Sequence, residues 1–243
     1  LGYMEQEGTV IGSSFERISG AINFTKSITK KLEFSTKNQA SYSYQDAFLE
    51  RSAYFSGART SIFFQSPLRQ PYNNDGSLNL FGGSLPNPLY LIDNDVNSNR
   101  FTRVLSNNSL RWNTTERLVL GTRFNVDYQI YNYRTYSNRN YGYGVPTSGN
   151  ASQYMRNNVF YVFQNFLEYN FDFNPDHVFD LTLLQEYQSN RFYYLGADGE
   201  NFPDDGLENL DNLGKITSAN SSVTDRYRAS YLGLFSYKLF DSK

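Results

Sequence analysis

The chain has 243 residues, a formal net charge of −2 and a mean hydropathy of −0.59, and 17% of its residues are aromatic. It contains no Cys, which excludes disulfide scaffolds and thiolate metal sites. No apolar run approaches the roughly 18 residues that a membrane-spanning helix needs, and no Lys/Arg-rich stripe is present to neutralise nucleic-acid phosphates. A helical membrane protein and a nucleic-acid-binding protein are therefore excluded, and any association with a membrane must use strands.

Strands are the predicted elements along the whole chain. In order they are Leu1–Gln6, Phe15–Lys26, Leu32–Gln45, Phe101–Trp112, Leu118–Ile130, Val159–Phe171, Phe179–Arg191 and Tyr227–Leu239. Alternation is strictest in Leu32–Gln45, where every second residue is polar and the other set ends in Tyr42 and Tyr44. Period-two alternation puts the two sets on opposite faces of a strand. A strand of this length, closed by aromatic residues, suits a tilted barrel strand in a membrane.

The connections alternate in length. Tight turns are predicted at Ser27–Lys31, Asn113–Arg117 and Asp172–Asp176, and between them lie Glu7–Ser14 and the long loops Asp46–Arg100, Arg134–Gln153 and Phe192–Ser222. Such long loops are uncommon in compact soluble domains, whereas outer-membrane barrels have short periplasmic turns and long extracellular loops. We therefore expect an all-β fold, an antiparallel transmembrane β-barrel segment of about eight strands. The alternative is a soluble β-sandwich, whose strands are usually shorter.

Five groups of residues follow one another in a specific order. They are Leu1–Gly8 with Gly12–Arg17, Ser66–Ser77 followed by Asn87–Leu89, Asn165–Tyr169, Phe202–Leu207, and Ser230–Tyr237. Their order resembles that of motifs in the SusC/RagA-like TonB-dependent transporters of Bacteroidota, and the resemblance covers nearly the whole chain. One departure is Leu234, which stands where the family pattern usually has Arg.

The resemblance implies a function and partners. It implies TonB-dependent import of a large nutrient, an oligosaccharide or a peptide, by the barrel subunit of a SusCD-like complex in the outer membrane. The partners would be outer-membrane lipid, a SusD-like surface lipoprotein, and TonB through a missing N-terminal region. Residues 1–243 would form part of one barrel domain of some 22 strands, with the signal peptide, the plug and the remaining strands absent from the chain. A passive porin, which would conduct ions without energy coupling, and a soluble β-rich adhesin remain alternatives.

Catalytic and metal-binding signals are weak. The sole histidine, His177, lies in a turn with no partner base in sequence, so we expect no catalytic residues, no enzyme activity and no cofactor. The stretch Asp93–Asn99 has oxygen ligands at alternate positions, but Ser98 and Val104 stand where a calcium loop needs Gly and Glu. The acidic loop Asp198–Asp211 could also bind calcium, yet solvation explains it as well. We expect no metal site.

Substrate contacts are expected from aromatic side chains at the mouth of the barrel, because sugar rings stack on aromatic faces. The candidates are Tyr136, Tyr141, Tyr143, Tyr193 and Tyr194. In barrels Tyr also forms the aromatic girdles at the membrane interfaces and packs within loops, and this is the alternative role for each of the five. A second set of polar residues is expected to face the lumen, where it would hydrate the interior or meet the plug: Arg123, Asp127, Glu168 and Glu186.

Overall fold

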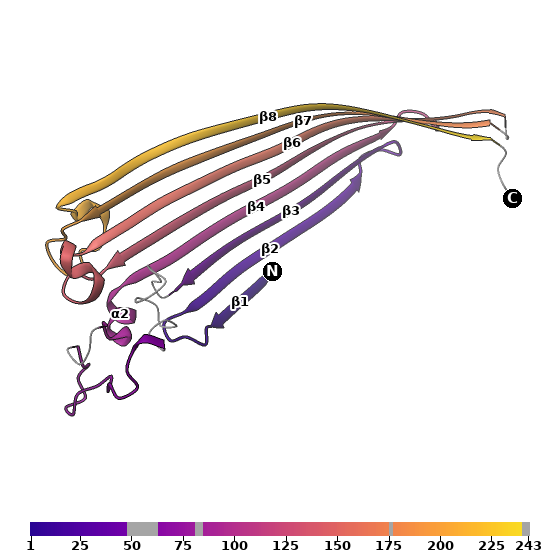
Figure 1. The fold of residues 1–243 in the computed structure, drawn as a ribbon. Coiled ribbons are helices and arrows are strands. Elements are labelled where there is room, and N and C mark those ends of the chain that lie inside the picture. The colour runs from indigo at the N-terminus through magenta and orange to yellow at the C-terminus, as the bar shows by residue number, and fades with distance from the viewer. Residues whose placement is uncertain (48–62, 81–84, 175–176, 240–243) are drawn as a thin grey trace.

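The fold is a single sheet of eight antiparallel strands in chain order (Figure 1). The computed structural model describes residues 1–47, 63–80, 85–174 and 177–239. The strands are β1 (Gly2–Glu7), β2 (Ser14–Ser27), β3 (Leu32–Asp46), β4 (Val96–Asn113), β5 (Leu118–Ser137), β6 (Asn150–Asn174), β7 (His177–Glu200) and β8 (Lys215–Leu239). Each strand pairs with its neighbours in sequence. The prediction of eight antiparallel strands is confirmed.

The connections are sorted between the two ends of the sheet (Figure 1). At one end, called the turn end, lie the short links β2–β3, β4–β5 and β6–β7. Two of these turns are closed in the same way, since the Thr29 and Thr115 hydroxyls accept the backbone N–H groups of Leu32 and Leu118 at 3.1 and 3.0 Å. The opposite end, called the loop end, carries helix α2 (Pro88–Asn94) and the 3-10 helices η1 (Gly142–Thr147) and η2 (Leu210–Asn212).

The strands near the loop end are longer than the sequence predicts. β6 begins at Asn150 rather than Val159, β7 runs to Glu200 rather than Arg191, and β8 begins at Lys215 rather than Tyr227. The added residues are mostly polar or small on both faces, so they carry no period-two signal. The backbone ladder nevertheless continues through them, because strand pairing needs only main-chain hydrogen bonds.

The sheet has one apolar and one polar face. Residues paired directly across strands project to the same side, and one such row crosses six strands as Leu32, Trp112, Leu120, Leu167, Leu183 and Gly233. The side that holds this row is called the apolar face. On it, Ile22 is 71% exposed and Trp112 47% exposed. A soluble sheet would cover such a surface, so the apolar face indicates an apolar environment.

The buried core lies at the loop end rather than in the sheet. Among the described residues, the buried apolar side chains are Leu91, Tyr136, Ala151, Phe166 and Phe202. Of these, Phe166 alone belongs to the middle of the sheet; the others lie in α2, in the loops or at strand ends next to them. No helix in the described part of the chain has the length and apolar character needed to cross a membrane.

Four polar residues interrupt the apolar face on β3 and β4. The hydroxyl of Thr36 donates to Asn108 at 2.7 Å, Asn108 donates to Ser106 at 3.0 Å, Ser106 donates to Asn38 at 2.6 Å, and Asn38 donates to Thr36 at 2.8 Å. The four side chains thus form a closed ring. Because each of the four side chains hydrogen-bonds within the ring, the free-energy cost of placing them on an apolar surface is low.

Candidate functional site: the polar face and the loop cap

The four residues expected to face a lumen all lie on the polar face. Asp127 accepts a bidentate pair from Arg103, at 3.0 and 2.8 Å, and Glu168 accepts from Arg111 at 2.8 Å. Glu186 is held by the side-chain amides of Gln164 and Gln188, both at 2.6 Å. The Arg123 guanidinium lies 4.6 Å from the Phe166 ring centre. These carboxylates are therefore already engaged within the sheet.

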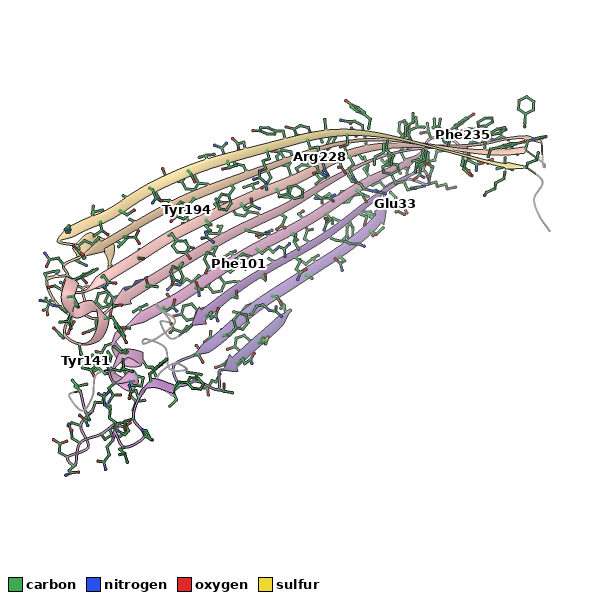
Figure 2. The ribbon with its side chains drawn as sticks, in the orientation of Figure 1. Glu33, Phe101, Tyr141, Tyr194, Arg228 and Phe235 are labelled. Atoms are coloured by element: carbon green, nitrogen blue, oxygen red, sulfur yellow. The ribbon has the colours of Figure 1, made fainter. Side chains whose placement is uncertain are left out.

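Nearer the loop end, the polar face becomes aromatic. Tyr154 of β6 lies 4.6 Å from Tyr133 and 6.1 Å from Tyr131, both on β5, and 6.0 Å from Tyr194 on β7, measured between ring centres. We call these four residues the tyrosine platform. Arg156 extends over it, with its guanidinium carbon 4.9 Å from the Tyr154 ring centre. Figure 2 labels Tyr194, near the loop end of β7.

The five tyrosines expected to contact substrate are not brought together. Tyr194 joins the tyrosine platform, whereas Tyr193 projects to the apolar face, where it pairs with Asn157 and Val223. Tyr136 is 1% exposed, which leaves it no surface for a ligand. Three residues of the platform, Tyr131, Tyr133 and Tyr154, were not predicted from the sequence. The sequence does carry a signal for them: Tyr131 and Tyr133 occupy alternate positions of β5, and Tyr154 lies directly across from Tyr133 on β6.

The other two expected tyrosines lie in the loops. The Tyr141 hydroxyl accepts the backbone N–H of Asn87 at 2.7 Å and donates to the Leu80 carbonyl at 2.9 Å. Its ring meets Tyr90 edge-on at 4.9 Å, and Figure 2 shows Tyr141 in the loops beside α2. Tyr143 is partly buried in η1, and this burial raises the pKa of its hydroxyl. Tyr141 therefore has a structural role in loop packing.

The loops of β5–β6 and β7–β8 pack together into what we call the loop cap. Phe202 is 1% exposed and meets Tyr136 edge-on at 5.1 Å, beside Ala151. The backbone continues the contact, since the N–H of Phe202 donates to the Ser148 carbonyl at 2.9 Å. The two loops are therefore one packed unit rather than separate solvated segments.

The acidic residues of the loops bond to the protein. Asp205 accepts from Asn138 at 3.2 Å, and Glu208 accepts from Arg134 at 3.0 Å. Asp95, in the other stretch with calcium-like spacing, accepts the backbone N–H of Asn138 at 2.8 Å. No cluster of three or more metal-ligating side chains occurs in the described ranges. In the acidic loop Asp204, Asp205 and Asp211 are exposed, as expected of a solvated loop, and Asp205 and Glu208 in addition fasten the loop to Asn138 and Arg134.

His177 is not an isolated turn residue. Its Nδ1 lies 2.6 Å from the Tyr237 hydroxyl, and the two rings stack with centres 5.9 Å apart. The contact holds β7 against β8 at the turn end.

Comparison with known proteins places the chain. No protein-family model matches it. A TonB-dependent receptor of Formosa agariphila is 25% identical over 250 residues, covering 100% of this chain and 23% of the receptor. The structure of the RagAB peptide transporter matches with a TM-score of 0.79 at 20% identity, over 98% of this chain and 28% of that one. RagAB in its open-open state matches with a TM-score of 0.77 at 18% identity, over 94% and 26%.

The chain resembles the SusC/RagA-like TonB-dependent transporters in sequence and in fold. The resemblance expected from the motifs is confirmed. The chain spans about a quarter of the length of the relatives it matches. The Formosa agariphila relative is named a receptor, and the two RagAB structures are named a peptide transporter and a peptide importer.

One motif of this SusC/RagA-like pattern has a clear structural role. Asn87 is 2% exposed, and its side-chain amide donates to the carbonyls of Pro71 and Asn79 at 2.9 and 3.1 Å. Its side-chain oxygen caps α2 by accepting the Leu89 N–H at 3.1 Å. In the same motif, bonds from Ser77 lower the pKa of the Asp75 carboxyl. The motif residues therefore hold the loop end together.

Proposed function

We propose that this chain forms part of the wall of an outer-membrane transporter that imports a large nutrient, an oligosaccharide or a peptide, with energy from TonB. The supporting observation is the combination of a long two-faced antiparallel sheet with connections sorted by length to its two ends. The match to a TonB-dependent receptor over the full chain supports the energy coupling. RagAB, which shares the fold, is named a peptide transporter.

In this proposal the apolar face meets lipid and the polar face lines the lumen. A lipid-facing barrel wall needs outward apolar side chains flanked by aromatic girdles, with polar residues inside. Phe171, Phe179 and Tyr237 stack in one row across β6, β7 and β8 on the apolar face near the turn end. Such a row suits one of the two interfacial girdles. Arg123, Asp127, Glu168 and Glu186 then line the interior.

The orientation and the partners belong to the same proposal. The loop end faces the cell exterior, where a SusD-like surface lipoprotein would cover it, and the turn end faces the periplasm. The plug, the TonB contact and the strands that complete the barrel would come from residues outside this stretch. Both edges of the sheet support this, because β1 and β8 each pair with one strand among the described residues.

Cysteine labelling in intact cells tests the orientation. In a cysteine-free full-length protein, Asn74→Cys would place a thiol in the loop end, and Lys30→Cys would place one in the β2–β3 turn. We expect a membrane-impermeant maleimide to label Asn74→Cys in intact cells and Lys30→Cys only after the outer membrane is permeabilised. Labelling of the turn thiol alone in intact cells would reverse the orientation. Labelling of both in a detergent-free soluble fraction would favour the adhesin.

Energy coupling is tested separately. Uptake of the nutrient by cells carrying the full-length protein should stop when TonB is deleted, while the protein stays in the outer membrane. Continued uptake without TonB, together with steady ion conductance of the purified protein in planar bilayers, would favour a passive pore. The two measurements therefore separate the transporter from the porin.

A further inference from the structure

Arg156 lies over aromatic rings on the polar face, as Arg123 lies over Phe166 farther along the sheet. It lies on the polar face of β6, between β5 and β7, and its side chain is exposed. Its guanidinium carbon lies 4.9 Å from the ring centre of Tyr154 and 5.9 Å from that of Tyr131. Stacking on aromatic faces orients the planar guanidinium while leaving its N–H groups free to donate.

The neighbours of Arg156 carry no carboxylate. On the polar face, its cross-strand partners are Tyr131 and Tyr194. The flanking positions on the three strands are Gln129, Tyr133, Tyr154, Asn158, Phe192 and Gly196. The charge of Arg156 is thus uncompensated among the residues that the structure describes around it. Arg103 and Arg111, on the same face, each pair with a carboxylate at 2.8 Å.

A small hollow on the polar face adjoins this cation. Its volume is about 240 Å³, and Asn158, Asn190, Phe192 and Arg226 are among the residues that line it. The side-chain oxygen of Asn190 is buried and has no hydrogen-bond partner within the described part of the chain. A buried acceptor left unpaired is costly, and a turn of the Asn190 side chain toward the hollow would let a donor pair with it. A ligand hydroxyl is such a donor.

The tyrosine platform is shaped by a glycine. A Cβ atom on Gly196 would lie 2.4 Å from the Tyr194 hydroxyl oxygen, so the Tyr194 side chain occupies the space that a side chain at position 196 would fill. The absent side chain lets Tyr194 lie along β7 and extend the row of rings formed with Tyr133 and Tyr154. The rings, tilted by 33° to 37° to one another, form a continuous aromatic surface beside the exposed Arg156.

We propose that the tyrosine platform, Arg156 and the adjoining hollow form a subsite for an acidic oligosaccharide. A carboxylate or sulfate group of the sugar accepts hydrogen bonds from the Arg156 guanidinium, which fits planar oxyanions. Sugar rings stack on the tyrosines, and a hydroxyl donates to Asn190. The aromatic surface and the unpaired Asn190 oxygen favour a carbohydrate over an acidic peptide. This inference rests on the proposed function, because it needs the polar face to line the transport path.

Binding to the full-length protein in detergent tests the subsite. The probes are tri-galacturonic acid, a sulfated galactotriose and neutral galactotriose, measured by titration calorimetry. We expect an acidic probe to bind the native protein and Arg156→Gln to weaken its binding by about tenfold to a hundredfold. Arg156→Lys keeps the charge but loses the planar guanidinium, so its affinity for the acidic probe should lie between those of the native protein and Arg156→Gln. Rising salt should weaken the binding of the acidic probe by the native protein more than by Arg156→Gln.

A matched variant controls for general damage. Arg191→Gln removes an arginine from the apolar face of the adjacent strand β7, where it faces Asp225 at 3.7 Å. It should leave the binding of all probes unchanged. If Arg156→Gln loses more affinity for tri-galacturonic acid than for the sulfated probe, the recognised group is a carboxylate. If it loses more affinity for the sulfated probe, the recognised group is a sulfate.

Three outcomes would overturn the subsite. One is equal affinity for acidic and neutral probes, and the second is an equal loss of binding for both kinds in Arg156→Gln. The third is that the protein binds none of the three saccharides but binds an acidic tetrapeptide in a way that depends on Arg156. If orientation and TonB-dependent uptake hold while these outcomes occur, the inference fails alone. If uptake proves independent of TonB, the proposed function fails instead.

Discussion

At the scale of single residues, the buried amide of Asn87 fastens the loop that precedes α2. Replacing Asn87 by Ala would leave the Pro71 and Asn79 carbonyls and the Leu89 N–H without this side chain. Each lost hydrogen bond costs about 0.5–1.5 kcal/mol. We expect the free energy of local opening to fall by about 2–3 kcal/mol. Limited proteolysis within residues 63–95 should then accelerate by roughly 30-fold to 100-fold.

Asn74→Ala is the matched control, because Asn74 is exposed in the same loop. It should leave the proteolysis rate near that of the native protein. The barrel should stay folded in both variants, as judged by the shift in gel mobility between heated and unheated samples. Equal rates of cleavage in the two variants would show that Asn87 does not hold the loop.

The same scale shows which site properties the sequence can predict. The common face of Arg123, Asp127 and Glu186 followed from period-two alternation, which is a local property of each strand. The contacts of the tyrosines did not follow. Tyr136 is buried by Phe202, which lies 66 positions away in the chain, and Tyr154 meets Tyr133 only through the register of β5 with β6. Such contacts depend on pairing and loop packing between distant segments.

At the scale of elements, β5 and β6 approach closely at one glycine. Gly121 lies directly across from Phe166, and a Cβ atom there would lie 2.1 Å from the Phe166 Cζ atom. The ring is 8% exposed and lies between two arginines, so it has little room to move. We expect Gly121→Ala to destabilise the folded full-length barrel by about 1–3 kcal/mol through overpacking, measured by urea unfolding in detergent.

Gly233→Ala provides the control for that measurement. Gly233 also lies within a strand, but a Cβ atom there would meet the Leu183 Cδ2 atom at 3.6 Å, an ordinary contact. Its substitution should change the unfolding midpoint little. A loss of stability as large as that of Gly121→Ala would assign the effect to strand glycines in general rather than to the approach of Phe166.

The existence of the elements could be predicted far better than their ends. Alternation with one apolar face predicted seven of the eight strands, most clearly Leu32–Gln45 and Leu118–Ile130, whereas Leu1–Gln6 was predicted only as a frayed strand. The extension of β8 back to Lys215 was missed, because its added residues are mostly Ser, Thr, Asn and Ala. Near the loop end the strands extend past the apolar part of the sheet, where neither face requires apolar side chains. The period-two pattern therefore ends before the backbone hydrogen-bond ladder does.

At the scale of the whole molecule, the loop cap packs the loops of two hairpins around one buried aromatic ring. Phe202→Ala would remove a fully buried side chain beside Tyr136, a change that typically costs about 3–5 kcal/mol. We expect hydrogen exchange to accelerate together in 138–149 and 201–214, because the two loops pack as a unit. Leu207→Ala, at a position that is 42% exposed in the same loop, should not accelerate it. Acceleration in one loop alone would show that the loops open independently.

The two free edges of the sheet lead to the last prediction. β1 is exposed along all six residues, and among the described residues β8 pairs only with β7. In lipid, unpaired backbone N–H and C=O groups cost several kcal/mol each. We therefore expect the 243-residue chain alone to aggregate on refolding into liposomes and to show no heat-dependent shift in gel mobility, whereas the full-length protein does. Refolding the chain together with the rest of the protein as a separate polypeptide should restore the shift. A monomeric, inserted chain whose β1 and β8 amides resist hydrogen exchange would instead mean that these two strands pair with each other in a small closed barrel.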